Sequence, residues 1–308
     1  KEIQNKIETI AKTAKVDLIN LHEPLYRFPE YFPDNLHPTK DGITIIAKKA
    51  YGAITGDYNG LKLPKFYGEN MVFQRGEPIL ISGTANANDV ITVVLNNQEA
   101  STIVAKNANW QITIPAMKAG GPYQFKIQSK LSENITFNTV YIGEVWLASG
   151  QSNMDFKVHE MQSAKTILKD SLNSNVFLFS MDPRVLNGRA FTKEDLAFNN
   201  TDDYFKYSGW SHSNDAVFEN FSAVAYAYVY RLQKELNVPI GIICNAVGGS
   251  PTQSWISRES MELTHETINM LNDSWENPLI DSWISQRKSE NFGFNKTLNA
   301  RHPYDPTF

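Results

Sequence analysis

The stretch Gly143-Glu144-Val145-Trp146-Leu147-Ala148-Ser149-Gly150-Gln151-Ser152-Asn153-Met154 determines how the second half of this chain is interpreted. Its apolar residues from Val145 to Ala148 predict a short buried strand, and Gly150 predicts a tight turn directly after that strand. A serine behind such a turn, here Ser152, can project its hydroxyl at the edge of a sheet beside exposed backbone N–H groups. That placement suits a nucleophile, because an acyl carbon can reach the oxygen and donors can hold the developing oxyanion.

The same spacing also has a plainer explanation. Serine is a favoured residue at the N-terminus of a helix, so Ser149 or Ser152 could simply cap the helix that follows. The spacing alone leaves both interpretations open.

The residues after position 141 have the pattern of an α/β domain. A helix is predicted near residues 221–236, and a buried strand from Ile240 to Ala246 ends at Gly248-Gly249. Two strands therefore end in glycine-containing turns, and ligands bind at this carboxyl edge in open parallel sheets. We expect an α/β domain over residues 141–308 with a parallel sheet and helices. Taken alone, Gly248-Gly249 favours an ordinary strand-to-helix turn over an oxyanion site.

Residues 64–140 instead alternate with a period of two, which predicts a small all-β domain, most simply a sandwich. Trp110, Tyr123 and Phe125 fall at core-facing positions of this alternation, so we interpret them as packing residues rather than a sugar platform. Residues 57–63 are the expected linker. The predicted strands cover residues 79–81, 90–95, 110–114, 123–127 and 135–137, with turns at Asn96-Asn97, Asn107-Ala108-Asn109 and Gly120-Gly121-Pro122.

Residues 1–56 are predicted to form a helix, a strand, a loop and a second helix. Apolar residues recur at helical spacing from Ile3 to Ala14 and from Ile43 to Ile54, and Val16 to Leu21 is a short apolar run. Two helices and one strand cannot bury their own apolar faces. This segment is therefore expected to be the last piece of an upstream α/β domain.

The loop Asp34-Asn35-Leu36-His37-Pro38 precedes the second of these helices. It places a carboxylate beside an imidazole, and in serine hydrolases such a carboxylate orients the ring and stabilises the imidazolium. Capping by Asp34 and a surface position for His37 is the plainer alternative. The strand-loop-helix order around the pair favours a catalytic origin.

The motif from Gly143 to Met154 closely resembles the nucleophile segment of the sialate O-acetylesterase family, which belongs to the SGNH hydrolases. The resemblance covers about residues 63–308. Its further parts are Leu63-Pro64, Glu69 to Arg75, Gly120 to Tyr123, Phe221 to Tyr226, Val238 to Ile243, and Gly248 to Pro251 with Trp255.

This resemblance implies an SGNH-hydrolase-like, flavodoxin-like fold with Ser152 as the nucleophile. The backbone N–H groups of Ser152 and Gly249 would then contribute to the oxyanion hole. Gln151 and Asn153 would hold the turn or contact the substrate. The implied reaction is hydrolysis of acetyl esters on sugars, with sialic acid or a plant polysaccharide such as xylan as the acetylated carbohydrate. The family also implies a periplasmic or secreted protein without a cofactor.

Two features depart from the family pattern. Neither its Gln-Gly-Glu-Ser-Asn-like run nor its C-terminal Asp-x-His-Pro block, which carries the general base, is present before Phe308. The 141–308 domain is therefore expected to be truncated, and a serine without a base is a weak nucleophile. His302 precedes a proline, but its surroundings resemble a mid-domain loop of the family, so we do not expect it to be the base.

The Asp34–His37 block resembles the last block of a GDSL-type SGNH domain, and two explanations compete for it. In the tandem explanation it belongs to a separate upstream domain. In the permuted explanation it folds back and serves Ser152 as base. We favour the tandem explanation, because the pattern of residues 1–56 is typical of the end of one domain that is followed by another.

Composition excludes several other functions. With 42% hydrophobic and 20% charged residues the chain is typical of globular proteins, and its net charge of -4 leaves no basic field for nucleic acid. No apolar run approaches the roughly 20 residues that cross a membrane. The single cysteine, Cys244, is expected to be buried, and no histidine, cysteine or carboxylate spacing predicts a metal site. A carbohydrate-binding β-domain beside an inactive hydrolase remains the alternative from another functional class.

Overall fold

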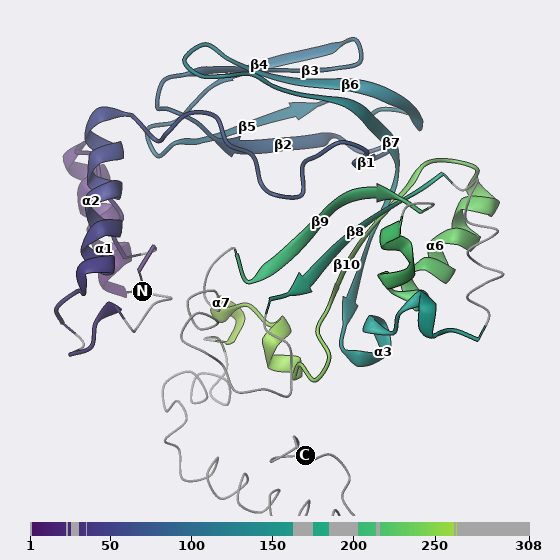
Figure 1. Cartoon of the computed structure of the whole chain (residues 1–308). Helices are drawn as coiled ribbons and strands as arrows, with labels where there is room; N and C mark the ends of the chain where they lie inside the picture. The colour runs from purple at the N-terminus through teal and green to yellow at the C-terminus, as the bar shows by residue number, and fades with distance from the viewer. Residues whose placement is uncertain are drawn as a thin grey trace, which may run out of the picture.

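The structure of the chain, a computed structural model, consists of two N-terminal helices, one long mixed sheet with a small second sheet packed on it, and further helices (Figure 1). It describes residues 2–22, 24–25, 31–34, 36–162, 175–184, 203–213, 216–261 and 263. None of the helices within these ranges has the length and apolar character needed to cross a bilayer.

The two N-terminal helices form where the apolar spacing predicts them, as α1 (Glu2–Ala14) and α2 (Lys40–Thr55). Gly56 ends α2 in the left-handed conformation, with a φ of 75°. The predicted strand from Val16 to Leu21 does not form. No described strand pairs with this run, and a strand without ladder partners has no backbone hydrogen bonds to hold it.

A β-rich layer follows, in which β4, β3, β6 and β7 are antiparallel neighbours and β2 and β5 form a separate two-stranded sheet. The small sheet lies against the large one (Figure 1), and one buried cluster joins Ile81 and Ile112 to Val93 and Ile127 across the two layers. The strands are β1 (Val72–Gln74), β2 (Ile79–Thr84), β3 (Val90–Leu95), β4 (Gln98–Ile103), β5 (Asn109–Ile114), β6 (Gly120–Ser129) and β7 (Ile135–Gly150).

The predicted packing role of the aromatic residues in this layer is confirmed. Trp110 and Phe125 are buried, and the half-buried Tyr123 packs against the same core. The turn predicted at Gly120-Gly121-Pro122 is wrong, because these residues begin β6 at a point where its register with β7 is irregular. Strands β1 and β4 were not predicted. β4 lies at the end of the sheet order and alternates half-buried with exposed residues, so it lacks a strong apolar signal.

Strand β7 connects the two halves of the molecule. Its first half pairs antiparallel with β6, and Glu144 to Gly150 pair in parallel with β10 (Ile240–Ala246). The separate strands predicted at 135–137 and 145–148 are therefore one strand of 16 residues. The predicted division between residues 140 and 141 falls inside this strand.

The second half of the sheet has the order β7-β10-β8-β9, with β8 (Val176–Pro183) parallel to β10 and β9 (Phe205–His212) antiparallel to β8. The sheet is thus mixed, with the expected parallel pairing of β7, β10 and β8 and an antiparallel β9 that was not expected. Helix α6 (Ala223–Leu236) packs on one face through a buried cluster that includes Tyr226. Cys244 is buried there, as predicted, and burial raises the pKa of its thiol to about 11.

The motif glycine Gly143 allows β7 and β10 to approach at the point where their pairing begins. Glu144 N donates a hydrogen bond of 3.0 Å to the carbonyl oxygen of Pro239. A Cβ atom at Gly143 would lie 1.9 Å from that same oxygen, which belongs to the backbone and cannot rotate away. Only glycine therefore fits this position without moving the strands.

We expect Gly143→Ala to lower the free energy of unfolding by about 1–3 kcal/mol, the usual cost of overpacking. Urea denaturation would measure the change. Gly68→Ala is the matched control, because a Cβ there would meet only a Trp210 ring carbon at 3.9 Å. Equal stability of the two variants would contradict this account of Gly143.

Candidate active site

The candidate site lies where the parallel strands β7, β10 and β8 end together. Gly150 and Ala246 are register partners at the ends of β7 and β10, and Val247 N donates a hydrogen bond of 3.0 Å to Gly150 O. Ser152 lies two residues after Gly150, and Gly249 lies three residues after Ala246. The parallel pairing therefore brings both predicted turns to one edge of the sheet (Figure 1).

The turn before Ser152 depends on glycine. Gly150 has a φ of 154°, a conformation that L-residues rarely adopt, and a Cβ there would lie 3.2 Å from Met154 Cβ. After it, Gln151 O accepts hydrogen bonds from Met154 N at 2.9 Å and Asp155 N at 3.0 Å, which close the short helix α3 (Ser152–Asp155). The sharp strand-to-helix turn is thus formed by local backbone contacts.

Ser152 is exposed at this turn, and so are its neighbours Gln151 and Asn153. The position that caps α3 is Gln151, and its side chain makes no capping hydrogen bond. Within the described residues, neither Ser149 nor Ser152 makes a side-chain hydrogen bond, so the capping explanation finds no support. The Ser152 hydroxyl is free to meet a ligand.

Gly249 lies in an exposed turn with a φ of 76°. Ser250 N closes the turn by donating a hydrogen bond of 3.1 Å to Val247 O. In the described part of the chain, neither Gly249 N nor Ser152 N donates a hydrogen bond to another residue. Both N–H groups are thus available to an anion at this edge.

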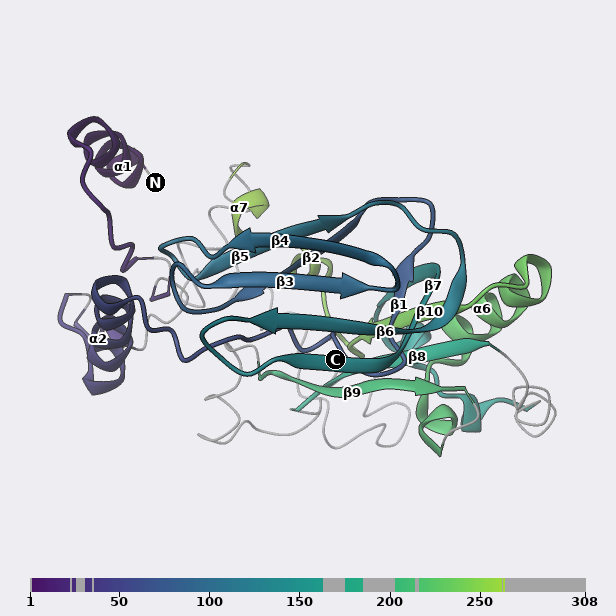
Figure 2. The same cartoon turned by 90° about the horizontal axis from the view of Figure 1, so that it is seen from above.

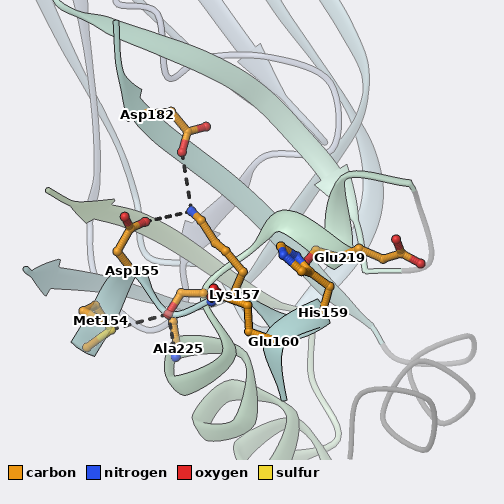
Figure 3. A network of polar contacts seen from close by, with 9 residues as sticks. Met154, Asp155, Lys157, His159, Glu160, Asp182, Glu219 and Ala225 are labelled. Carbon is orange, nitrogen blue, oxygen red and sulfur yellow. Dashed lines mark hydrogen bonds and ion pairs between the residues drawn. The ribbon is translucent and has the colours of Figure 1, made fainter. Parts of the chain in front are cut away.

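A lysine that the sequence analysis did not single out anchors α3 to the sheet (Figure 3). Lys157 Nζ lies 2.7 Å from Asp155 Oδ1 and 3.8 Å from Asp182 Oδ1 near the end of β8. Burial raises the pKa of Asp182, and the charge of Asp155 raises it further, whereas Lys157 and Lys206 oppose the shift. Asp155 and Lys157 stand beside the motif, but no sequence signal pairs them with Asp182, 25 residues downstream of Lys157.

The segment after α3 is also fixed to the start of α6 (Figure 3). Ser222 Oγ accepts a hydrogen bond from Ala225 N at 3.2 Å and lies 3.6 Å from Met154 Sδ. His159 Nδ1 lies 2.9 Å from the carbonyl oxygen of Glu219. These contacts restrict the motion of the chain that carries Ser152.

The structure forms a close pair between Asp34 and His37. His37 Nδ1 lies 2.6 Å from Asp34 Oδ2, while Asp34 Oδ1 accepts hydrogen bonds from His37 N at 2.7 Å and Leu36 N at 3.0 Å. These bonds, with the His37 backbone N–H as the largest contribution, lower the pKa of Asp34 to about 2. The carboxylate therefore stays ionised and fixes the orientation of the imidazole ring.

The structure does not bring this pair to Ser152. Helix α2, which follows His37, lies beyond one end of the β-rich layer, while α6, against which α3 packs, lies at the opposite side in both views (Figures 1 and 2). The His37 side chain is 77% exposed, and Asp34 is its only side-chain partner among the described residues. His302 lies outside the described residues.

The residues that the structure describes contain no group of three histidine, cysteine or carboxylate side chains that could hold a metal ion.

The chain is similar in sequence to known sialate O-acetylesterases. The chain is 28% identical to the sialate O-acetylesterase of Pongo abelii over 216 residues, which are 66% of this chain and 40% of the relative. It is 27% identical to the sialate O-acetylesterase of Rattus norvegicus over 232 residues, 71% of this chain and 41% of the relative. The predicted likeness to these enzymes is confirmed, and the chain spans about two fifths of their length. No family model matches the chain.

A solved structure resembles the chain as well. The crystal structure of a carbohydrate acetylesterase from Xanthomonas citri superimposes with a TM-score of 0.54 and 23% sequence identity. The match covers 67% of this chain and 45% of that one. At this identity the likeness concerns the fold.

The Lys157 contacts lead to a prediction about stability. Lys157→Met leaves Asp155 and Asp182 without their shared cation and should destabilise the protein at pH 7 by about 1 kcal/mol, as expected for a half-exposed ion-pair network. The effect should shrink toward pH 4, because Asp182 becomes neutral as the pH falls through its raised pKa. Urea denaturation of both proteins at the two pH values would measure it.

Lys106→Met is the matched control, since Lys106 pairs with Asp17 and both side chains are more than 70% exposed. Its effect should stay below about 0.5 kcal/mol at either pH. A Lys157→Met effect that is no larger, or that grows toward pH 4, would show that the Lys157 contacts do not hold α3.

Proposed function

We propose that this chain belongs to a carbohydrate O-acetylesterase in which Ser152 is the nucleophile. The observation that supports this most strongly is the exposed Ser152, whose hydroxyl has no hydrogen bond within the described residues and which lies two residues after the positive-φ Gly150 at the carboxyl edge of the sheet. The similarity to sialate O-acetylesterases over two thirds of the chain supports the same reaction class. The likeness of fold to a carbohydrate acetylesterase agrees with an SGNH-type α/β arrangement of the second half.

The reaction needs few protein groups at this edge. Ser152 Oγ attacks the carbonyl carbon of a sugar acetate, and the carbonyl oxygen becomes an oxyanion that the N–H groups of Ser152 and Gly249 can hold. The C–O bond to the sugar then breaks, and the sugar oxygen takes up the proton lost by Ser152. Water hydrolyses the acetyl-serine, which releases acetate and restores the hydroxyl.

The general base for Ser152 is part of this proposal. Within the described residues no histidine or carboxylate side chain hydrogen-bonds the Ser152 hydroxyl, so we infer that the base is supplied by residues outside them. Asp34 and His37 already form an oriented pair at another place. We therefore propose that they derive from a separate SGNH-like module, as the tandem explanation requires.

A carbohydrate-binding role for the β-rich layer is the second candidate function. It would need an aromatic platform on one face of a sheet. Trp110 and Phe125 are buried and Tyr123 packs on the core, so these three residues do not supply that platform. The esterase is therefore the better supported function.

We expect Ser152→Ala to lower the turnover of p-nitrophenyl acetate by the full-length protein at least about 1,000-fold, because the nucleophile acts as a unit with its base and oxyanion hole. A fluorophosphonate should label the peptide that contains Ser152, as located by mass spectrometry. Ser149→Ala is the matched control, since Ser149 is an exposed serine of the same motif. Retained turnover in Ser152→Ala would rule out the assignment.

His37→Ala tests the separate-module proposal. Because helix α2, which directly follows this pair, and helix α6, against which α3 packs, lie at opposite sides of the molecule (Figures 1 and 2), fluorophosphonate labelling of Ser152 in the full-length protein should proceed at an unchanged rate. If His37 were the base of Ser152, labelling would slow by several orders of magnitude. That result would establish the permuted explanation instead.

A further inference from the structure

A hollow of about 400 Å³ opens at the same sheet edge as Ser152. It is lined by Tyr204 and Phe205 at and just before the start of β9, and by Asn245 and Val247 at and just after the end of β10. The short helix η4 (Thr252–Trp255), with the residues that follow it, lines it as well. The volume lies in the range of small-ligand sites and would accommodate a sugar ring.

Backbone pairing links the hollow to the candidate nucleophile. Asn245 is the register partner of Ser149 on β7, and parallel partners point to the same face of a sheet. Ser250, another lining residue, directly follows Gly249. The hollow therefore borders the Gly248-Gly249 turn, through Val247 and Ser250, and its residue Asn245 pairs with β7 three residues before Ser152.

Asn245 supplies an unused polar group. Its Oδ1 is buried and has no hydrogen-bond partner among the described residues. Such a group costs about 1–3 kcal/mol when it stays unpaired. The amide can turn about χ2, so either its acceptor or its donor can face a hydroxyl that enters the hollow. A ligand with hydroxyl groups would remove the penalty.

Trp255 supplies an apolar surface that is held in place. It is 38% exposed, and its Nε1 donates a hydrogen bond of 3.0 Å to Ser250 Oγ, which restricts the orientation of the indole. Tyr204 packs edge-on against Phe205 with ring centroids 4.8 Å apart. Fixed aromatic walls around a few polar groups suit a sugar ring, which has apolar C–H faces and hydroxyls at its rim.

The charge of the lining restricts the class of sugar. None of the described residues that line the hollow carries a charge. The carboxylate of a sialic acid would lose water here without gaining a cation, which is unfavourable. An uncharged ring of a pentose or hexose meets no such penalty.

We propose that this hollow is the subsite for an uncharged sugar ring of the acetylated substrate, with Asn245 and Trp255 as its specificity-determining residues. The proposal rests on the proposed esterase function and adds the substrate class. It predicts that a neutral sugar acetate, such as an O-acetylated methyl xyloside, is a better substrate than an O-acetylated sialic acid.

The test uses the full-length protein and two substrates, the acetylated methyl xyloside and p-nitrophenyl acetate, which has no sugar. Trp255→Ala and Asn245→Ala should each lower kcat/KM for the xyloside about tenfold more than for p-nitrophenyl acetate, mainly through a higher KM. Trp146→Ala is the matched control, because Trp146 is 39% exposed and packs edge-on against Tyr228, outside the hollow. It should leave the ratio of the two kcat/KM values unchanged.

Binding separates this proposal from the esterase assignment. Unacetylated methyl xyloside, followed by ligand-observed NMR, should bind to the Ser152→Ala protein and lose its signal change in Trp255→Ala, whichever residue is the nucleophile. Equal losses on both substrates in the Trp255 and Asn245 variants would overturn the subsite. A wild-type preference for the acetylated sialic acid would overturn the assignment to uncharged sugars.

Discussion

The backbone hydrogen bonds of β7 hold the two halves of this molecule together. The strand pairs with β6 along its first half and with β10 along its second, and β1 pairs with it where the two sets meet. Glu69 supports this crossing point by accepting hydrogen bonds from the N–H groups of Asn138 and Thr139. Because the strand is continuous, the β-rich layer and the sheet edge beside Ser152 share one backbone.

The position of Ser152 follows from that strand in three steps. Gly143 lets β10 approach, the parallel register then aligns the ends of β7 and β10, and Gly150 turns the chain so that Ser152 leaves the sheet beside Gly249. The Lys157 ion pairs then tie the new helix to β8 across β10. These contacts use backbone geometry and the two Lys157 ion pairs, and none of them involves the Ser152 hydroxyl.

The Asp34–His37 pair is a local motif that forms without contacting Ser152 in the described part of the chain. Asp34, Leu36 and His37 form their hydrogen bonds with one another, without a partner from the rest of the described fold. The helices beside this pair leave apolar residues such as Ile3 and Ile54 exposed, and Leu36 in the loop is exposed as well. Exposed apolar faces of this kind are ones that helices usually bury against another element.

The sequence by itself determined the features that depend on neighbours along the chain: the helices α1, α2 and α6, strands such as β3 and β10, the turn at Gly150 and the exposed Ser152. Local apolar periodicity and backbone sterics are sufficient for these. Only the tertiary structure decided that residues 135–150 form one strand, that β9 runs antiparallel, that Lys157 meets Asp182, and that Asn245 lies unpaired in a hollow beside Trp255. These depend on pairing and contacts between residues far apart in sequence, whose free energy no local pattern records.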